Sequence, residues 1–290
     1  MAILVTGAAG LVGRAAVAAL LRQEVEHVRA VVREPAQVAG LRRLGAKVAL
    51  LEATDHDGLA AAMDGVFTAC SLTGGLWPRP GEDPYAAVVE PARVFLAAAA
   101  AAGVRRVVVC SPAAVGTPAA PDPPGHPPGV PRTPPANPHL AAKAEVERMV
   151  TASGLEHAIL RCAHVLGPGG RLVELLAGPA PVPVPGDGRQ RVAPVWVGDV
   201  AAAIAAADDA VELSATWSLA GPDEIAFDDL VDAIQGAPVA KRHLDGEAGP
   251  LTPTQLEVLA ADSLADPGLP APPGLAATTL AEALAGSAVR

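Results

Sequence analysis

A histidine and a lysine four residues apart, His139 and Lys143, form the pair of side chains best suited to chemistry. Residues at this spacing lie on one face of a helix, so both side chains can point toward the same ligand. Asn137 and Pro138 are typical of an N-cap and a first helical residue, which places His139 in the first turn. There the helix dipole and the lysine disfavour an imidazolium, so His139 should be neutral and able to donate one hydrogen bond or act as a base. The alternative is a polar residue on a helix face with no chemical role.

A second chemical signal is the glycine-spaced segment TGAAGLVG at residues 6–13. It follows an apolar run that predicts a strand and begins a run that predicts a helix. Glycines in such a turn let the backbone approach a pyrophosphate, whose charge is met by free N–H groups and the helix dipole. We therefore predict that this segment binds a dinucleotide through Gly7, Ala9, Gly10, Leu11 and Val12.

The end of the second predicted strand, VVRE, bears on which dinucleotide binds. Its last side chain should lie beside the adenosine ribose. Arg33 would pair with a 2′-phosphate and favours NADP, whereas a shift of one residue would place Glu34 on the ribose hydroxyls and favour NAD. Arg14, in the first turn of the first helix, is either a second cation for that phosphate or a solvated helix residue. The prediction is NADP (NADPH in its reduced form) in preference to NAD.

The elements that must position these residues alternate along the first half of the chain. Apolar runs predict strands at residues 2–6, 28–32, 47–51, 66–71 and 104–111, and helical runs at residues 11–22, 36–44, 57–63 and 84–103 separate them. Apolar strands that are each followed by a helix are typical of a parallel sheet covered on both faces. The fold class is therefore α/β, a Rossmann doubly wound parallel sheet with a small C-terminal α/β lobe.

The domain organisation follows from two changes in the pattern. Residues 116–138 are proline-rich and form either an inert surface linker or a loop that covers the substrate. Beyond residue 163 the helices and strands become less regular. We expect residues 1–162 to form an NAD(P)-binding Rossmann domain that includes this loop, and residues 163–290 to form a smaller substrate-binding lobe, partly interleaved with the sheet.

The composition narrows the class of protein. The net charge is −10 and there is no run of lysines or arginines, which argues against nucleic-acid binding. The three cysteines lack a CxxC spacing, which argues against a disulfide framework or a thiolate metal site and favours the cytoplasm. No apolar run is suited to span a bilayer. We expect a cytoplasmic monomer or homodimer that binds a small-molecule substrate and no metal, nucleic acid or membrane.

In the order and spacing of its motifs the sequence resembles the atypical or extended short-chain dehydrogenase/reductases, in particular the NmrA-like NAD(P)-binding proteins. The motifs that carry the resemblance are TGAAGLVG at 6–13, Arg33, ATDHDGL with Asp55, AAGVRRVVVCS at 101–111, KAEVE at 143–147, SGLEHAILR at 153–161, VWVGDVA at 195–201 and WSLAGPDEIAFDDL at 217–230. The resemblance covers most of the chain. It implies a Rossmann sheet of about seven strands and a small C-terminal substrate lobe.

The resemblance also implies roles for individual residues. Asp55 would contact the adenine, although it could instead be the N-cap of the following helix. Ser71 and Leu72 would run along the cofactor ribose. Ser111 would orient the substrate, and Lys143 would hold the nicotinamide ribose.

The sequence departs from the family at the proton donor. In catalytic short-chain dehydrogenases a tyrosine four residues before the lysine protonates the substrate, and here that residue is His139. Tyr85, the only tyrosine, has no lysine four residues later, which excludes the tyrosine-based reaction. Other donors that could serve near the site are His126 in the proline-rich segment and His164.

The leading hypothesis is an NAD(P)H-dependent reductase of a small, largely apolar substrate: a carbonyl, an imine, an activated alkene or a quinone. Its catalytic residues would be His139, Lys143 and Ser111. Two alternatives stay open. One is a non-catalytic NADP(H)-sensing regulator that acts through protein partners, and the other is a nonreductive isomerase or cyclase on the same scaffold.

Overall fold

The computed structural model describes residues 2–23, 25, 27–79, 81–115, 137–211, 213–244 and 249–286. Most of the predicted proline-rich loop, and His126 within it, lie outside the described residues. No helix in the described part of the chain combines the length and the apolar character needed to cross a membrane.

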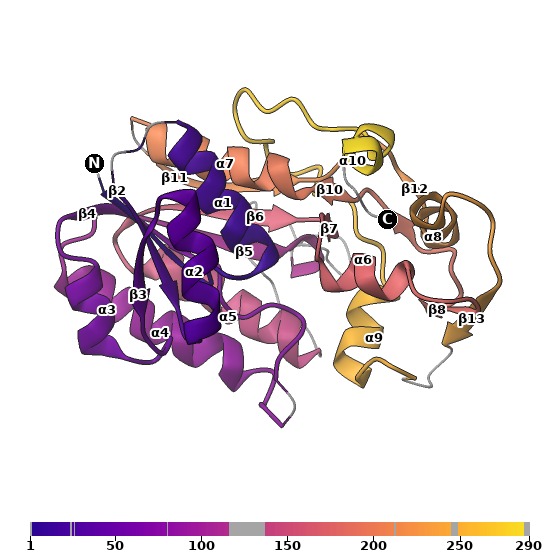
Figure 1. The fold of residues 1–290 in the computed structure, drawn as a ribbon, viewed down its shortest axis with the longest axis horizontal. Coiled ribbons are helices and arrows are strands. Elements are labelled where there is room, and N and C mark those ends of the chain that lie inside the picture. The colour runs from indigo at the N-terminus through magenta and orange to yellow at the C-terminus, as the bar shows by residue number, and fades with distance from the viewer. Residues whose placement is uncertain are drawn as a thin grey trace, which may run out of the picture.

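A seven-stranded parallel sheet forms the centre of the molecule (Figure 1). Its strands are β1 (Ala2–Thr6), β2 (His27–Val32), β3 (Lys47–Leu50), β4 (Val66–Ser71), β5 (Arg106–Pro112), β6 (Glu156–Cys162) and β11 (Ser214–Leu219). Their order is β11-β6-β5-β4-β1-β2-β3. The chain thus runs outward from β1 to β2 and β3, crosses to the other side of β1, and runs outward again from β4. This arrangement confirms the predicted doubly wound sheet and creates a crevice at the carboxyl ends of β1 and β4, where such folds bind ligands.

Helices cover both faces of the sheet. One face carries α1 (Leu11–Arg22), α2 (Pro35–Leu44) and α7 (Val197–Asp209), and the other carries α3 (His56–Ala62), α4 (Ala86–Ala101) and α5 (Pro138–Ala152). All five residues of β1 are buried, as expected for a strand covered on both sides. Ile3 and Val5 join the core beneath α1 and α7, and Leu4 joins the core beneath α4 and α5, because successive side chains of a strand point to opposite faces.

Helix α4 begins two residues later than the sequence pattern predicts. The carboxylate of Asp83 accepts hydrogen bonds from the N–H groups of Tyr85 and Ala86, at 3.1 and 2.7 Å, and so caps the helix from outside its first turn. Tyr85 is 40% exposed.

A smaller lobe packs against the carboxyl edge of the sheet and lies to the right in Figure 1. Its main elements are α6 (Arg171–Leu176), β8 (Val182–Pro185), α8 (Phe227–Gln235), β13 (Lys241–Leu244) and α9 (Pro253–Leu259), which share a third hydrophobic core. The short elements are η1 (Ala113–Val115), β7 (Val165–Leu166), β9 (Arg191–Val192), β10 (Val195–Trp196), β12 (Ile225–Ala226) and α10 (Leu280–Gly286). Strand β11, from the second half of the chain, belongs to the large sheet through its pairing with β6.

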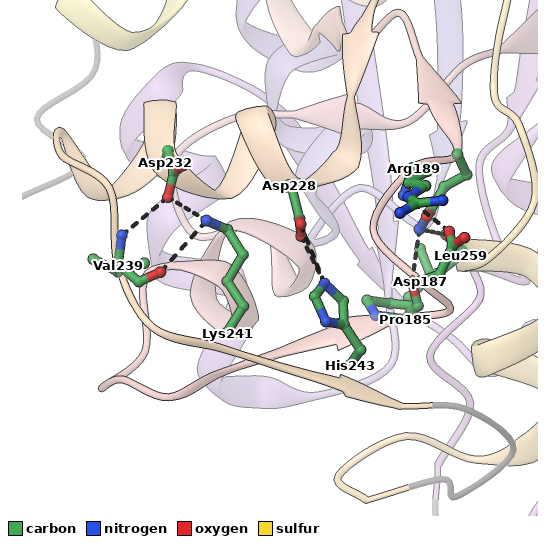
Figure 2. Close-up of polar contacts among 10 residues, drawn as sticks. Pro185, Asp187, Arg189, Asp228, Asp232, Val239, Lys241, His243 and Leu259 are labelled. Carbon is green, nitrogen blue, oxygen red and sulfur yellow. Dashed lines mark hydrogen bonds and ion pairs between the residues drawn. The ribbon is translucent and has the colours of Figure 1, made fainter.

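An ion pair and a histidine–carboxylate hydrogen bond join α8 to β13 in this lobe (Figure 2). Asp228 and Asp232 are one helical turn apart, and His243 and Lys241 are two residues apart on the strand, so each pair of side chains shares a face. The Lys241 ammonium lies 2.6 Å from the Asp232 carboxylate, and His243 Nε2 lies 3.0 Å from the carboxylate of Asp228. The matched helical and strand spacings thus align the helix alongside the strand, with the two running in opposite directions.

A buried ion pair holds α5 against the sheet. The side chains of Arg161 on β6 and Glu147 on α5 are 1% and 3% exposed, and their charged atoms are 2.7 Å apart. The same guanidinium lies 3.4 Å from the carboxylate of Asp266, so it also ties the C-terminal segment to the sheet. Since a buried charge without its partner is strongly unfavourable, removal of either partner should be costly.

We expect Glu147→Ala to lower the free energy of unfolding by about 3–5 kcal/mol, because it removes a buried carboxylate that pairs with the buried Arg161 guanidinium. Urea unfolding followed by circular dichroism measures this loss. The control is Glu145→Ala on the same helix, which removes the partially exposed Glu145–Arg148 ion pair and should cost at most about 1 kcal/mol. Equal effects of the two substitutions would contradict a special role for the buried pair.

Candidate cofactor and active site

The glycine loop between β1 and α1 has the geometry that a bound pyrophosphate requires. Gly7 has a φ of +65°, and a Cβ at this position would lie 2.5 Å from the carbonyl oxygen of Leu72. Only glycine fits there without strain. Gly10 is the N-cap of α1 and supplies no side-chain bond to the first turn, so N–H groups at the start of this helix are available to an anion.

A pocket of about 900 Å³ opens over this loop. Gly7, Ala9 and Gly10 line it next to the sheet. Arg33 lines it at the end of β2. His139 lines it from α5, which lies on the opposite side of β1 from β2. We refer to these parts as the Arg33 side and the His139 side of the pocket.

Three further residues predicted from the glycine motif lie on the first turns of α1. The methyl groups of Leu11 approach the backbone at Gly170, and Val12 packs against the hydrophobic core. The guanidinium of Arg14 lies beside Gly169, with Nη2 3.3 Å from where a Cβ would be. None of these three is among the described residues that line the pocket.

Asp55 and Ser71, assigned by resemblance, are not among the described residues that line the pocket, although their neighbours Thr54 and Leu72 are. The Asp55 carboxylate accepts a hydrogen bond from the N–H of Gly58 at 3.0 Å and is the N-cap of α3, as in the second of its two predicted roles. Ser71 is buried at the end of β4, where its hydroxyl lies 3.5 Å from that of Thr73. Leu72, the next residue, lines the pocket.

The Arg33 side of the pocket contains a second arginine that sequence reasoning missed. Arg79, from the loop between β4 and α4, lines the pocket and places its Nη2 2.8 Å from Oε1 of Glu34. The Nε of Arg33 lies 3.9 Å from the same oxygen. No pattern in the sequence singles out Arg79, because the conformation of its loop determines where the side chain points.

Lys143 is buried and its ammonium joins two strand ends. Nζ donates to the carbonyl oxygen of Cys110, near the end of β5, at 3.2 Å, and to that of Thr73, after β4, at 3.4 Å. Burial lowers the pKa of Lys143, while Cys110, Glu147 and Cys162 act in the opposite direction. The lysine is thereby fixed at the carboxyl edge of the sheet beside the pocket wall that Leu72 and Thr73 form.

His139 lies in the first turn of α5, as predicted, with its side chain 3% exposed. The Asn137 side chain caps the helix by accepting hydrogen bonds from the N–H groups of His139 and Leu140, at 3.0 and 3.3 Å. Burial, and secondarily the charge of Lys143, lowers the pKa of His139 to about 3. No described residue forms a hydrogen bond with its ring nitrogens, so the pocket contains a neutral, unpaired imidazole at physiological pH.

Two other predicted donors lie away from the pocket lining. Ser111, next to Cys110, is buried and its hydroxyl has no hydrogen-bond partner among the described residues. His164 is buried after β6 with Nε2 similarly unpaired, and its ring meets Phe227 edge-on at 6.1 Å. Burial lowers the pKa of His164 to about 4.

Helix α9 of the smaller lobe completes the His139 side of the pocket. Its N-cap Thr252, together with Thr254 and Gln255, lines the pocket. Nδ2 of Asn137 donates to the carbonyl of Thr254 at 3.0 Å and to the carboxylate of Glu257 at 2.8 Å. The sequence pattern of Thr252 and Gln255 predicts a capping box, but no sequence signal places that box beside His139.

Comparisons with known proteins agree with this geometry. Residues 7–207 match the model of the NAD(P)H-binding family. The chain belongs to this family. The match confirms the predicted NAD(P)-binding protein, while the placement among the short-chain dehydrogenase/reductases and in their NmrA-like branch stays a prediction. No curated protein matches the sequence significantly.

Solved structures share the fold over almost the whole chain. The NADPH-dependent quinone oxidoreductase of Escherichia coli, solved with NADPH, is 21% identical with a TM-score of 0.72, and the alignment covers 98% of each chain. The UDP-glucuronic acid 4-epimerase of Bacillus cereus, solved with UDP-glucuronic acid and NAD, is 17% identical with a TM-score of 0.72 and coverage of 98% of this chain and 97% of the epimerase.

The buried histidine makes the stability of the fold depend on pH. The pKa of His139 falls from 6.5 to about 3 on folding, so between these values the unfolded chain binds a proton that the folded chain does not. This contribution to stability is complete above pH 6.5 and is lost as the pH falls toward 3. His139→Asn should therefore lose less stability than the wild type between about pH 7 and pH 5, measured by urea unfolding. His27→Asn, at an exposed position, should retain the wild-type dependence, and identical curves for all three proteins would contradict the prediction.

The side-chain amide of Asn137, which caps α5, also links the two lobes, and a substitution can test this link. Asn137→Asp keeps the helix cap but replaces the donor group with an oxygen that faces Glu257 and the carbonyl of Thr254. We expect a loss of about 1–3 kcal/mol in stability and faster amide exchange in α9, measured by hydrogen exchange with mass spectrometry. Glu257→Gln in the same protein should restore part of the loss by supplying a donor, and no recovery would contradict this account.

Proposed function

We propose that the protein is an NADPH-dependent reductase of a small, uncharged, largely apolar substrate, with quinones as the first class to test. The observation that carries the proposal is the buried, neutral imidazole of His139, which has no hydrogen-bond partner among the described residues and lies in the same pocket as the glycine loop. In this proposal the Rossmann domain at residues 1–162 holds the cofactor and the lobe at residues 163–290 covers the substrate.

The contacts of Arg33 and Glu34 support NADPH over NADH. Arg33 lines the pocket, while the Glu34 carboxylate is paired with Arg79 and lies near the guanidinium of Arg33. A carboxylate used in this way is a poor acceptor for ribose hydroxyls, whereas guanidinium groups suit a phosphate. The cofactor would supply the hydride.

Lys143 and His139 have separate tasks in this mechanism. Lys143, fixed between two strand ends, holds the nicotinamide ribose, as the resemblance implies. His139 donates one N–H to the substrate oxygen and so stabilises the charge that develops there. With a pKa of about 3 it is not a store of protons at neutral pH, so the final proton comes from water. Substrates that accept a hydride with little acid catalysis, such as quinones or activated alkenes, suit such a site.

The polar groups on the His139 side favour an uncharged substrate. The Gln255 amide is used within the protein, because its Nε2 donates to the carbonyl of Leu76 and its Oε1 accepts from the N–H of Thr252. Arg33 and Arg79 are the only cationic side chains among the described residues that line the pocket, and they are on the opposite side. A nucleotide sugar would require cations for its diphosphate, so this lining argues against the ligand class of the epimerase.

Turnover of NADPH with a panel of quinones, carbonyls and imines tests the proposal directly. We expect NADPH oxidation with quinones, followed by absorbance. His139→Phe keeps an aromatic ring but removes the donor, so kcat/KM should fall about 10-fold to 100-fold without a change in the Kd of NADPH. Lys143→Met, in contrast, should raise the Kd of NADPH. Tight binding of NADPH without turnover of any substrate would contradict the reductase and favour a regulator.

A further inference from the structure

We propose that Arg79 and Arg33 form a clamp for the 2′-phosphate of NADPH, and that the carboxylate of Glu34 occupies the clamp until the phosphate displaces it. The inference rests on the NADPH preference in the proposed function and adds a specificity-determining residue to it. Its basis is a single oxygen, Oε1 of Glu34, which lies 2.8 Å from Nη2 of Arg79 and 3.9 Å from Nε of Arg33.

The three side chains come from two separate parts of the chain. Arg33 follows β2 and Glu34 is the N-cap of α2, where its side chain forms no capping hydrogen bond. Arg79 belongs to the loop after β4, which meets the β2 end through this ion pair. The shared anion therefore draws the loop toward the place where the ribose of a bound dinucleotide would lie.

The loop itself is built to present Arg79. The N–H of Arg79 donates to the carboxylate of Glu82 at 2.8 Å, and the N–H of Glu82 donates back to the carbonyl of Arg79 at 3.1 Å. Asp83, the next acidic residue, is used by the N–H groups at the start of α4. The backbone of Arg79 is thus fixed, while its side chain, 45% exposed, is free to turn toward a ligand.

Exchange of the carboxylate for a phosphate is favourable on charge and geometry. A phosphate monoester carries up to two negative charges and three acceptor oxygens, so it can pair with both guanidiniums, each through two N–H groups. The Glu34 ion pairs that it replaces are exposed and contribute little to stability. The Glu34 side chain, 49% exposed, can turn into solvent. NADH has no group that competes for the arginines, so Glu34 would stay paired with them.

Binding of adenosine fragments isolates this effect from catalysis. The full-length protein is titrated by calorimetry with 2′,5′-ADP, which carries the 2′-phosphate, and with 5′-AMP, which lacks it. Arg79→Ala should weaken binding of 2′,5′-ADP and NADPH about 5-fold to 10-fold and leave 5′-AMP and NADH unchanged. Glu34→Gln should strengthen binding of 2′,5′-ADP about 2-fold to 5-fold, because the internal competitor is removed.

The matched control is Arg191→Ala in the smaller lobe. Arg191 is 46% exposed and its ion pair with Glu224 spans 3.0 Å, so it resembles the Arg79 pair in exposure and distance. This substitution should change no binding constant. Unchanged circular dichroism spectra will show that the exposed substitutions leave the fold intact.

The outcomes separate this inference from the proposed function. If Arg33→Ala abolishes the preference for 2′,5′-ADP while Arg79→Ala does not change it, the clamp is wrong and the NADPH preference stands. If the wild type binds 2′,5′-ADP no tighter than 5′-AMP, the NADPH preference itself is wrong. Weaker binding in Glu34→Gln would overturn the role of Glu34 as a competitor.

Discussion

The placement of α5 depends on the buried ion pair between Arg161 and Glu147, and the candidate site depends on α5. His139, Lys143 and Glu147 are spaced four residues apart and form one stripe along this helix. Glu147 pairs with Arg161 of the sheet, Lys143 donates to carbonyls at the strand ends, and His139 lines the pocket. A shift of the helix along the sheet would therefore displace the ammonium and the imidazole together.

The same stripe determines the charge of each residue. Burial lowers the pKa of Lys143 while Cys110, Glu147 and Cys162 oppose this shift, and the charge of Lys143 in turn disfavours protonation of His139. Burial alone would already favour a neutral imidazole, so the two effects act in the same direction at His139. The chemistry available at the pocket is thus limited by the packing of the helix: a hydrogen bond can be donated to a substrate, but a proton is not held in reserve.

The sequence predicted those features that depend on local patterns. The strands, the glycine turn and the start of α5 at Pro138 follow from apolar periodicity, the strand-to-helix turn and a capping asparagine. Arg79, Thr254 and the contacts of Asn137 with α9 could not be predicted, because they depend on how long loops fold and on how the second half of the chain packs. The direction of Arg14 belongs to the same class, since the nearby loop at Gly169 decides where its side chain lies.

The cationic side chains and the neutral imidazole of the pocket lie on different sides of it. Its two cationic side chains among the described residues, Arg33 and Arg79, are on the side of β2, where a charged cofactor can be recognised through its phosphate. On the other side the Gln255 amide donates to the carbonyl of Leu76, and the imidazole of His139 has no hydrogen-bond partner among the described residues. A histidine in this position is shorter than the tyrosine of related catalytic enzymes, so the substrate must approach α5 closely or be reached through water. A neutral donor, on a side of the pocket where no described lining residue is cationic, is compatible with the uncharged substrate of the proposed function.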